Sequence, residues 1–106
     1  MIQTREYHLD IGDVELAVVE WPGEGDPVLL LHATGFHSRC WNQVVKRLPN
    51  RHIFAVDLRY HGNSGSLGEV DWNVLSQDIS LLVEKLDLRN VVGVGHSIGG
   101  YPVSYT

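Results

Sequence analysis

The sequence has 106 residues, which is enough for one domain with a single hydrophobic core and too few for two. A hydrophobic content of 43% with 20% charged residues excludes a disordered chain. The formal net charge of −5 and the absence of a Lys/Arg cluster argue against nucleic acid or an anionic membrane surface as a partner.

The single cysteine, Cys40, excludes an intramolecular disulfide framework and is typical of a reducing compartment. Residues 1–6 lack the charged-then-apolar layout of a signal peptide, and no apolar run approaches the roughly 20 residues that a membrane span needs. We therefore expect a cytoplasmic location.

The N-terminal third of the chain predicts three strands. Residues 6–11 and 14–21 read as strands joined by a two-residue hairpin turn at Gly12 and Asp13. Residues 22–27 are rich in Pro and Gly and predict a loop. Residues 28–31 are apolar throughout, which is typical of a central parallel strand covered on both faces.

The next segment predicts a helix over residues 38–48, which begins at Ser38, a good N-cap, and ends before Pro49. Cys40 falls among the apolar positions of this helix, so we expect its thiol to be buried. The apolar positions at helical spacing are Trp41, Val44, Val45 and Leu48.

Two further strands flank a second helix. Residues 53–56 predict a buried strand, and a helix capped near Asp71 follows the loop after it. The apolar face of this helix consists of Leu75, Ile79, Leu82 and Leu86. Residues 91–94 are mostly valine and predict a last buried strand.

This order of elements predicts an α/β fold: a mostly parallel sheet of about five strands with an N-terminal β-hairpin and flanking helices. Ligands in such folds bind beyond the carboxyl ends of the strands. Residues 32–37, 57–65 and 95–99 all follow strands at that end, so we expect these three loops to converge.

Residues 95–99 contain the pattern G-x-S-x-G directly after a predicted strand. A serine at the tip of a tight strand-to-helix turn needs neighbours with almost no side chain, and Gly95 and Gly99 provide that room. The turn would lift the Ser97 hydroxyl above the sheet, where the free N–H groups of the next helix stabilise an oxyanion. The pattern predicts that Ser97 is a nucleophile.

The same stretch also fits the glycine spacing of a dinucleotide-binding turn, through Gly93, Gly95 and Gly99. That motif is expected in the first βαβ unit, with an acidic residue about 20 positions later. Here the turn follows four predicted strands and only seven residues follow Gly99, so a dinucleotide-binding half-domain is the weaker alternative.

Three ordered segments resemble the α/β-hydrolase fold, and the resemblance, to the N-terminal part of that fold, covers essentially the whole chain. The segments read LHATGF (residues 31–36), DLRYHGNS (residues 57–64) and GHSIGG (residues 95–100). The resemblance implies a nucleophile elbow at Gly95, His96, Ser97 and Gly99, and an oxyanion hole formed by the backbone N–H groups of Thr34 and Ile98. It implies that His32, Ala33 and Phe36 line the site.

The function that this resemblance implies is esterase-like hydrolysis of a small-molecule substrate through Ser97. The family's triad continues with an acid and then a histidine. The nine residues after Ser97 contain neither, so we expect residues 1–106 to be the N-terminal part of one domain, truncated after the elbow. The alternative is a non-catalytic fragment or binding module, and in either case the last strand would be an open edge through which chains associate.

The polar residues outside the motif indicate structural roles. His8, His37, His52 and His61 lack the spacing of metal ligands, and we expect no metal and no cofactor. His32 is expected to bind backbone amides of the oxyanion loop rather than act as a base, and His96 to pack or line the site. An aspartate that closes a strand, as Asp57 does, most often accepts hydrogen bonds from loop N–H groups.

Overall fold

The computed structural model describes residues 4–32, 37–59, 64–65 and 72–96. These ranges form a five-stranded sheet, a short 3-10 helix (η1) and two α-helices. The elements are β1 (Arg5–Asp10), β2 (Glu15–Trp21), β3 (Glu24–Leu31), η1 (Ser38–Trp41), α1 (Asn42–Lys46), β4 (Arg51–Val56), α2 (Trp72–Lys85) and β5 (Val92–Gly95).

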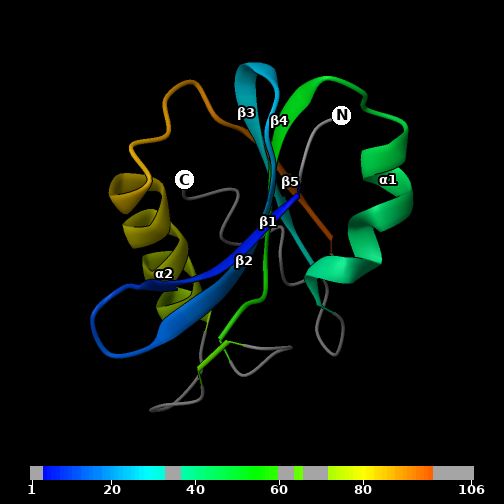
Figure 1. The fold of residues 1–106 in the computed structure, drawn as a ribbon. Helices are drawn as coiled ribbons and strands as arrows, with labels where there is room; N and C mark the ends of the chain where they lie inside the picture. The colour runs from blue at the N-terminus through cyan, green and yellow to red at the C-terminus, as the bar shows by residue number, and fades with distance from the viewer. Residues whose placement is uncertain (1–3, 33–36, 60–63, 66–71, 97–106) are drawn as a thin grey trace.

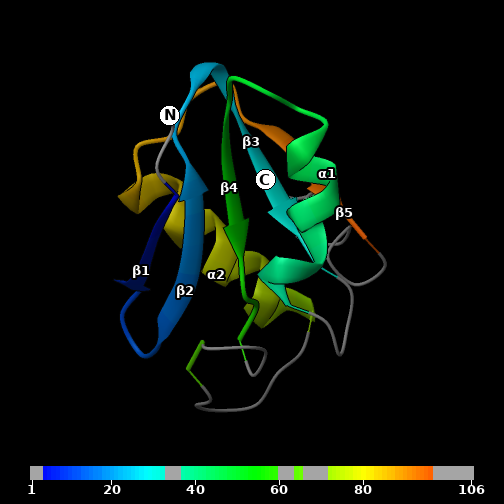
Figure 2. The same cartoon turned by 45° about the vertical axis from the view of Figure 1, so that its right-hand side comes forward.

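The sheet has the order β1-β2-β4-β3-β5. Strand β3 lies parallel to both β4 and β5, whereas β2 is antiparallel to β1 and to β4. Four strands therefore run in one direction and β2 alone runs against them. Helix α1 covers one face of the sheet and α2 the other (Figures 1 and 2). The predicted fold class is confirmed, with a mixed sheet that is mostly parallel.

The β1–β2 hairpin closes at the predicted turn. Asp10 pairs with Glu15, and inside that pair the Ile11 N–H donates to the Val14 carbonyl at 3.0 Å. Gly12 has a φ of 124°, a backbone conformation that residues with a side chain rarely adopt. The Asp10 carboxylate accepts the Gly12 N–H at 2.8 Å, so the turn is fixed by a side chain as well as by the ladder.

Alternation along the two central strands divides the core into two layers. Leu29 and Leu31 of β3 belong to the cluster that includes residues of α2, whereas Leu30 packs in the cluster that contacts α1. Phe54 and Ala55 of β4 alternate in the same way. Residues 28–31 and 53–56 of these strands are buried on both faces, which explains why these two runs are apolar without interruption.

Helix α2 buries the face that its sequence predicts. Leu75, Ile79 and Leu82 are fully buried against the sheet, and Leu86, just beyond the helix, is partly buried. None of the helices in the described ranges is both long and apolar enough to cross a bilayer.

The helical segment after β3 differs from the prediction in its start and in two buried positions. Its first four residues form η1, and only Asn42–Lys46 are α-helical. Trp41, Val45 and Leu48 pack on the sheet, whereas Cys40 and Val44, expected to be buried, are exposed. Each of these two precedes a packing residue by one position, so it points away from the sheet, by about 120° around the 3-10 helix for Cys40 and about 100° around α1 for Val44.

The loop predicted for residues 22–27 is shorter than expected, because β3 begins at Glu24. Glu24 pairs with Arg51, and the register shifts before the next pair, Val28 with Ile53. Gly25 has a φ of 82° inside this shift. The breaker residues thus produce an irregular strand start rather than a loop.

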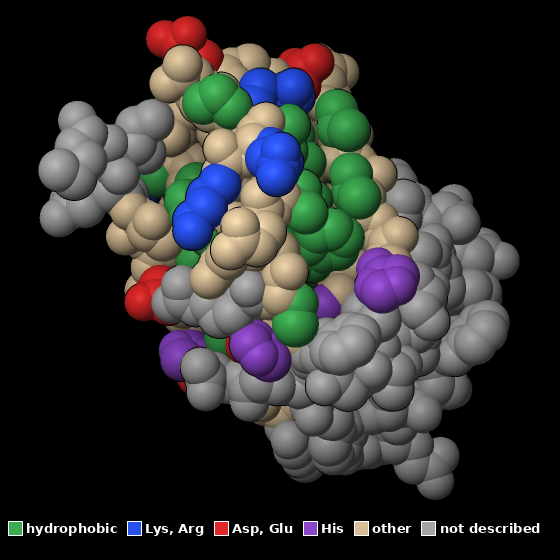
Figure 3. All heavy atoms as spheres, turned by 90° about the vertical axis from the view of Figure 1, so that its right-hand side faces the viewer, with side chains coloured by type: hydrophobic (Ala, Val, Ile, Leu, Met, Phe, Trp, Pro, Cys, Tyr) green, Lys and Arg blue, Asp and Glu red, His purple; other side chains and the backbone are tan. Residues whose placement is uncertain are grey.

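The prediction that the last strand is buried is wrong. Val92 is 45% and Val94 39% exposed. Among the described residues β5 pairs with β3 alone, so its outer edge and much of its side-chain surface have no neighbour. Figure 3 shows the α1 side of the molecule, where hydrophobic side chains reach the surface among basic residues and histidines. Association through the β5 edge remains a prediction.

The two neighbouring leucines of α2 test this packing. Leu82→Ala should lower the free energy of unfolding by about 2–5 kcal/mol, because it leaves a cavity in the core. Leu81, which is 38% exposed, is the matched control, and Leu81→Ala should cost less than about 1 kcal/mol. Urea denaturation measures both, and equal losses would contradict the assignment of the buried face.

Candidate active site

The carboxyl ends of three parallel strands meet at one edge of the sheet. Leu31, the last residue of β3, pairs with Val56 on one side and with Gly95 on the other. The ladder continues one residue beyond β5, because the His96 N–H donates to the Leu31 carbonyl at 3.0 Å. The three segments that the sequence predicts to converge therefore begin at adjacent strand ends.

His32 joins the end of β3 to the segment that leaves β4. Its residue is 1% exposed, and its Nε2 accepts the Leu58 N–H at 2.9 Å. Because Nε2 is an acceptor here, the hydrogen bond assigns the ring proton to Nδ1. His32 thus binds a backbone amide of the segment after β4, whereas its expected contact with the oxyanion loop, residues 33–36, falls outside the described residues. With Nε2 occupied and the ring buried, His32 is poorly placed to act as a base.

Asp57 performs the predicted role. It is buried, and its Oδ1 accepts the Ser38 N–H at 2.7 Å, so that the carboxylate holds the start of η1. Its own N–H donates to the Ala17 carbonyl of β2 at 2.9 Å. A carboxylate that accepts a buried N–H forms a strong, charge-assisted hydrogen bond. Asp57 thus ties η1, β4 and β2 together beneath the site.

Ser64 links the segment after β4 to β2, a role that the sequence did not predict. Its hydroxyl donates to the Asp57 carbonyl and accepts the Ala17 N–H, the latter at 2.7 Å. Gly65 donates to the Glu15 carbonyl at 2.7 Å, and a Cβ at Gly65 would lie 2.9 Å from the Val14 Cβ. The loop after β4 is therefore anchored to β2 by close backbone approach, which requires a small residue.

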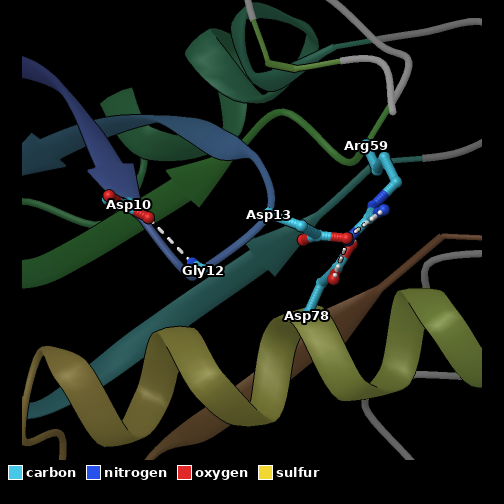
Figure 4. Close-up of polar contacts among 5 residues, drawn as sticks. All are labelled: Asp10, Gly12, Asp13, Arg59 and Asp78. Carbon is cyan, nitrogen blue, oxygen red and sulfur yellow. Dashed lines mark hydrogen bonds and ion pairs between the residues drawn. The ribbon is translucent and has the colours of Figure 1, made fainter. Parts of the chain in front are cut away.

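Arg59 carries a buried charge at this edge and was also missed as a bridging residue. Its side chain is 5% exposed and binds two carboxylates, those of Asp13 in the hairpin turn and Asp78 of α2 (Figure 4). Nε and Nη2 donate to Asp78 at 2.9 and 2.8 Å, and Nη1 and Nη2 donate to Asp13 at 3.0 and 2.8 Å. Both contacts are bidentate, the geometry in which a guanidinium binds carboxylates most firmly.

The two carboxylates respond differently to Arg59. Hydrogen bonds from Arg59 lower the pKa of Asp13, which is 54% exposed. Burial raises the pKa of Asp78, and the hydrogen bonds from Arg59 oppose that change. The pKa of Arg59 is raised, chiefly by its hydrogen bonds to Asp78, so the guanidinium stays protonated. The pKa shifts of the two carboxylates thus have opposite signs. The bidentate geometry nevertheless supports ion pairing of Arg59 with both of them.

Most of the residues predicted to do chemistry lie outside the described residues: Ser97, Thr34, Ile98, Gly99, Ala33 and Phe36. The described members are His32, Gly95 and His96, and the pairing of β3 with β5 brings them to the same edge. His96 is exposed at the end of β5, and its predicted role in packing against or lining the site stays a prediction because residues 97–106 lie outside the described residues.

Within the described ranges no three His, Cys, Asp or Glu side chains gather closely enough to hold a metal ion.

The amino-acid sequence is similar to those of known proteins. Residues 28–105 match the model of the alpha/beta hydrolase family. A non-heme haloperoxidase from Rhodococcus erythropolis is 34% identical over 93 residues, which cover 85% of this chain and 34% of the haloperoxidase. Ethanol acetyltransferase 1 from Eremothecium cymbalariae is 32% identical over 78 residues, which cover 71% of this chain and 22% of that protein.

The fold is also similar to solved structures. The crystal structure of a bromoperoxidase from Bacillus anthracis superimposes with a TM-score of 0.87 at 29% identity, over 95% of this chain and 38% of the bromoperoxidase. The chain thus spans between about a fifth and two fifths of the length of these three proteins.

Removal of the buried cation tests the network around Arg59. Arg59→Met should lower the free energy of unfolding by about 3–5 kcal/mol, because it leaves Asp78 buried without its partner. The double substitution Arg59→Met with Asp78→Leu should recover most of that loss. The exposed pair of Arg89 with Asp87 is the control, and Arg89→Met should cost less than about 1 kcal/mol. A loss in the double variant as large as in Arg59→Met alone, measured by urea denaturation, would contradict this account.

The Asp13 contact should respond to acid. Because the folded-state pKa of Asp13 lies below the unfolded value of about 3.9, its contribution to stability is complete above that value and is lost as the pH falls through the folded pKa. Carboxyl carbon NMR should show Asp13 titrating at a lower pH in the unsubstituted protein than in Arg59→Met, which removes the hydrogen bonds from Arg59. An unchanged Asp13 titration in that variant would refute the assigned cause.

Proposed function

The chain belongs to the alpha/beta hydrolase family, and we propose that Ser97 is the nucleophile of a serine-dependent hydrolase that acts on ester-like bonds. The observation that carries this proposal is the pairing of Leu31 with Gly95. Ser97 follows the end of β5 by two residues, and Thr34 follows the end of β3 by three. Neighbouring strands lie about 4.8 Å apart, so a nucleophile and an oxyanion donor would start from adjacent positions.

The proposed chemistry is acyl transfer through a covalent intermediate. The Ser97 Oγ attacks the carbonyl carbon while a general base takes its proton, and the backbone N–H groups of Thr34 and Ile98 bind the oxyanion. The bond to the leaving alcohol then breaks as that alcohol takes the proton. Water, deprotonated by the same base, attacks the acyl carbon; the bond to Ser97 Oγ breaks as Oγ takes that proton, which releases the acid and restores the serine. One oxyanion donor is worth about 10²–10³ in rate.

The base is not assigned to the described residues. His32 is buried with Nε2 bound to the Leu58 N–H, which removes it as a candidate. In this family the acid and the histidine follow the serine in the sequence, and residues 98–106 contain neither. The proposal therefore assigns to residues 1–106 the nucleophile and the oxyanion donors, and takes the base and the acid from outside them.

The names of the relatives support acyl chemistry without fixing the substrate. An acetyltransferase transfers an acyl group, which is the first half of the proposed reaction, whereas the two peroxidases are named for halide chemistry. Family membership also favours a nucleophile elbow over a dinucleotide-binding turn for the glycines at the end of β5.

A covalent probe tests the role of Ser97. In the natural polypeptide that carries these residues, a fluorophosphonate should form an adduct on Ser97, located by mass spectrometry. Ser97→Ala should lose the adduct and lower the hydrolysis of p-nitrophenyl acetate by at least about 10³-fold. Ser80, exposed on α2, is the control, and Ser80→Ala should retain both. A folded protein that is not labelled at Ser97 would overturn the proposal in favour of a binding module.

A further inference from the structure

The β1–β2 hairpin turn reaches the proposed active-site edge through one side chain. We propose that Asp13 is a positioning residue: by holding Arg59, it fixes residues 57–59, which in turn orient His32 at the start of the predicted oxyanion loop. This inference rests on the proposed function for its catalytic consequence, although the structural coupling can be measured without it.

The first link runs from the turn to the guanidinium. Both oxygens of Asp13 accept hydrogen bonds from Arg59, at 2.8 and 3.0 Å, although the two residues are 46 positions apart in the sequence (Figure 4). Asp78 occupies the other side of the guanidinium, and Nη2 donates to both carboxylates. A planar group bound on two edges cannot rotate without breaking one contact, so Asp13 fixes the direction of a cation that Asp78 already binds.

The two carboxylates therefore have separable roles. Asp78 is 4% exposed and its loss would leave a buried charge unpaired, whereas Asp13 is 54% exposed and can be replaced at little cost in burial. A substitution at Asp13 can loosen Arg59 without unfolding the protein. Asp13 is thus the better position at which to separate positioning from stability.

The second link runs from Arg59 to the site. Leu58, the residue before Arg59, donates its N–H to His32 Nε2 at 2.9 Å, and its side chain is fully buried. Asp57 is held by β2 and η1. A displacement at Arg59 is therefore transmitted to the hydrogen bond between Leu58 and His32, which lies one residue away along the chain. His32 immediately precedes residues 33–36, in which the predicted oxyanion donor lies.

Asp10 provides a matched control within the same hairpin. Its carboxylate accepts the Gly12 N–H at 2.8 Å, a contact inside the turn, whereas Asp13 bridges the turn to Arg59. Asp10→Asn and Asp13→Asn make the same chemical change three residues apart. Only the second removes a charge from the bridge.

The catalytic test uses the natural polypeptide and p-nitrophenyl acetate. Asp13→Asn should lower kcat by about three- to tenfold and leave KM within about twofold, because a small misplacement of a group near the reaction affects the transition state more than substrate binding. Asp10→Asn should leave both constants within about twofold. Equal effects of the two variants would overturn the proposal.

Amide hydrogen exchange tests the coupling without activity. In Asp13→Asn, exchange at the Leu58 amide should rise about tenfold, whereas exchange at Ala55, inside the sheet, should stay unchanged. Unchanged exchange at Leu58, or an equal rise at both amides, would overturn the positioning role. A selective rise at Leu58 in a protein whose Ser97 does not react would support the coupling and reject only the hydrolase proposal.

Discussion

The parallel pairing of β3 with both β4 and β5 is the constraint on which the rest of this structure depends. Leu31 lies between Val56 and Gly95, so that three strand ends share one edge. The pairing is possible because β3 is apolar on both faces and is covered by α1 on one side and α2 on the other. An element that follows β3 therefore begins between the ends of β4 and β5, and an element that follows β4 or β5 begins beside the end of β3.

A shared edge creates a cost, because the backbone groups beyond the strand ends lose their ladder partners while they remain buried. The structure meets this cost with side chains. His32 accepts the Leu58 N–H, Asp57 accepts the Ser38 N–H, and Ser64 bridges the Asp57 carbonyl and the Ala17 N–H. All three are residue types that can do chemistry in other sites, yet here each one binds backbone groups. Polar residues near an active site thus divide into those that bind backbone groups at the strand ends and those that are available for catalysis.

The sequence predicted those structural features that are determined by residues close together in the chain. The apolar spacing of Leu75, Ile79 and Leu82 predicted α2, and the hairpin turn followed from Gly12 and its neighbours, because short-range periodicity and turn chemistry determine both. The valine-rich pattern of β5 wrongly predicted a buried strand, since an edge strand can have the same sequence; its edge position was expected from the resemblance and not from this local pattern. The bridge from Asp13 to Arg59 was invisible for a similar reason: no local pattern links residues 46 apart.

The comparisons limit what this part of the chain can determine about the reaction. Proteins with names as different as a haloperoxidase and an acetyltransferase are similar to it over most of its residues, although each is about three to five times as long as the matching stretch. What these proteins share here cannot be what distinguishes their chemistries. The described residues accordingly provide a scaffold that does not by itself select a reaction: a sheet edge at which loops begin side by side, held by buried hydrogen bonds. The positioning role proposed for Asp13 is of the same kind, because it would act on geometry and would not select a substrate.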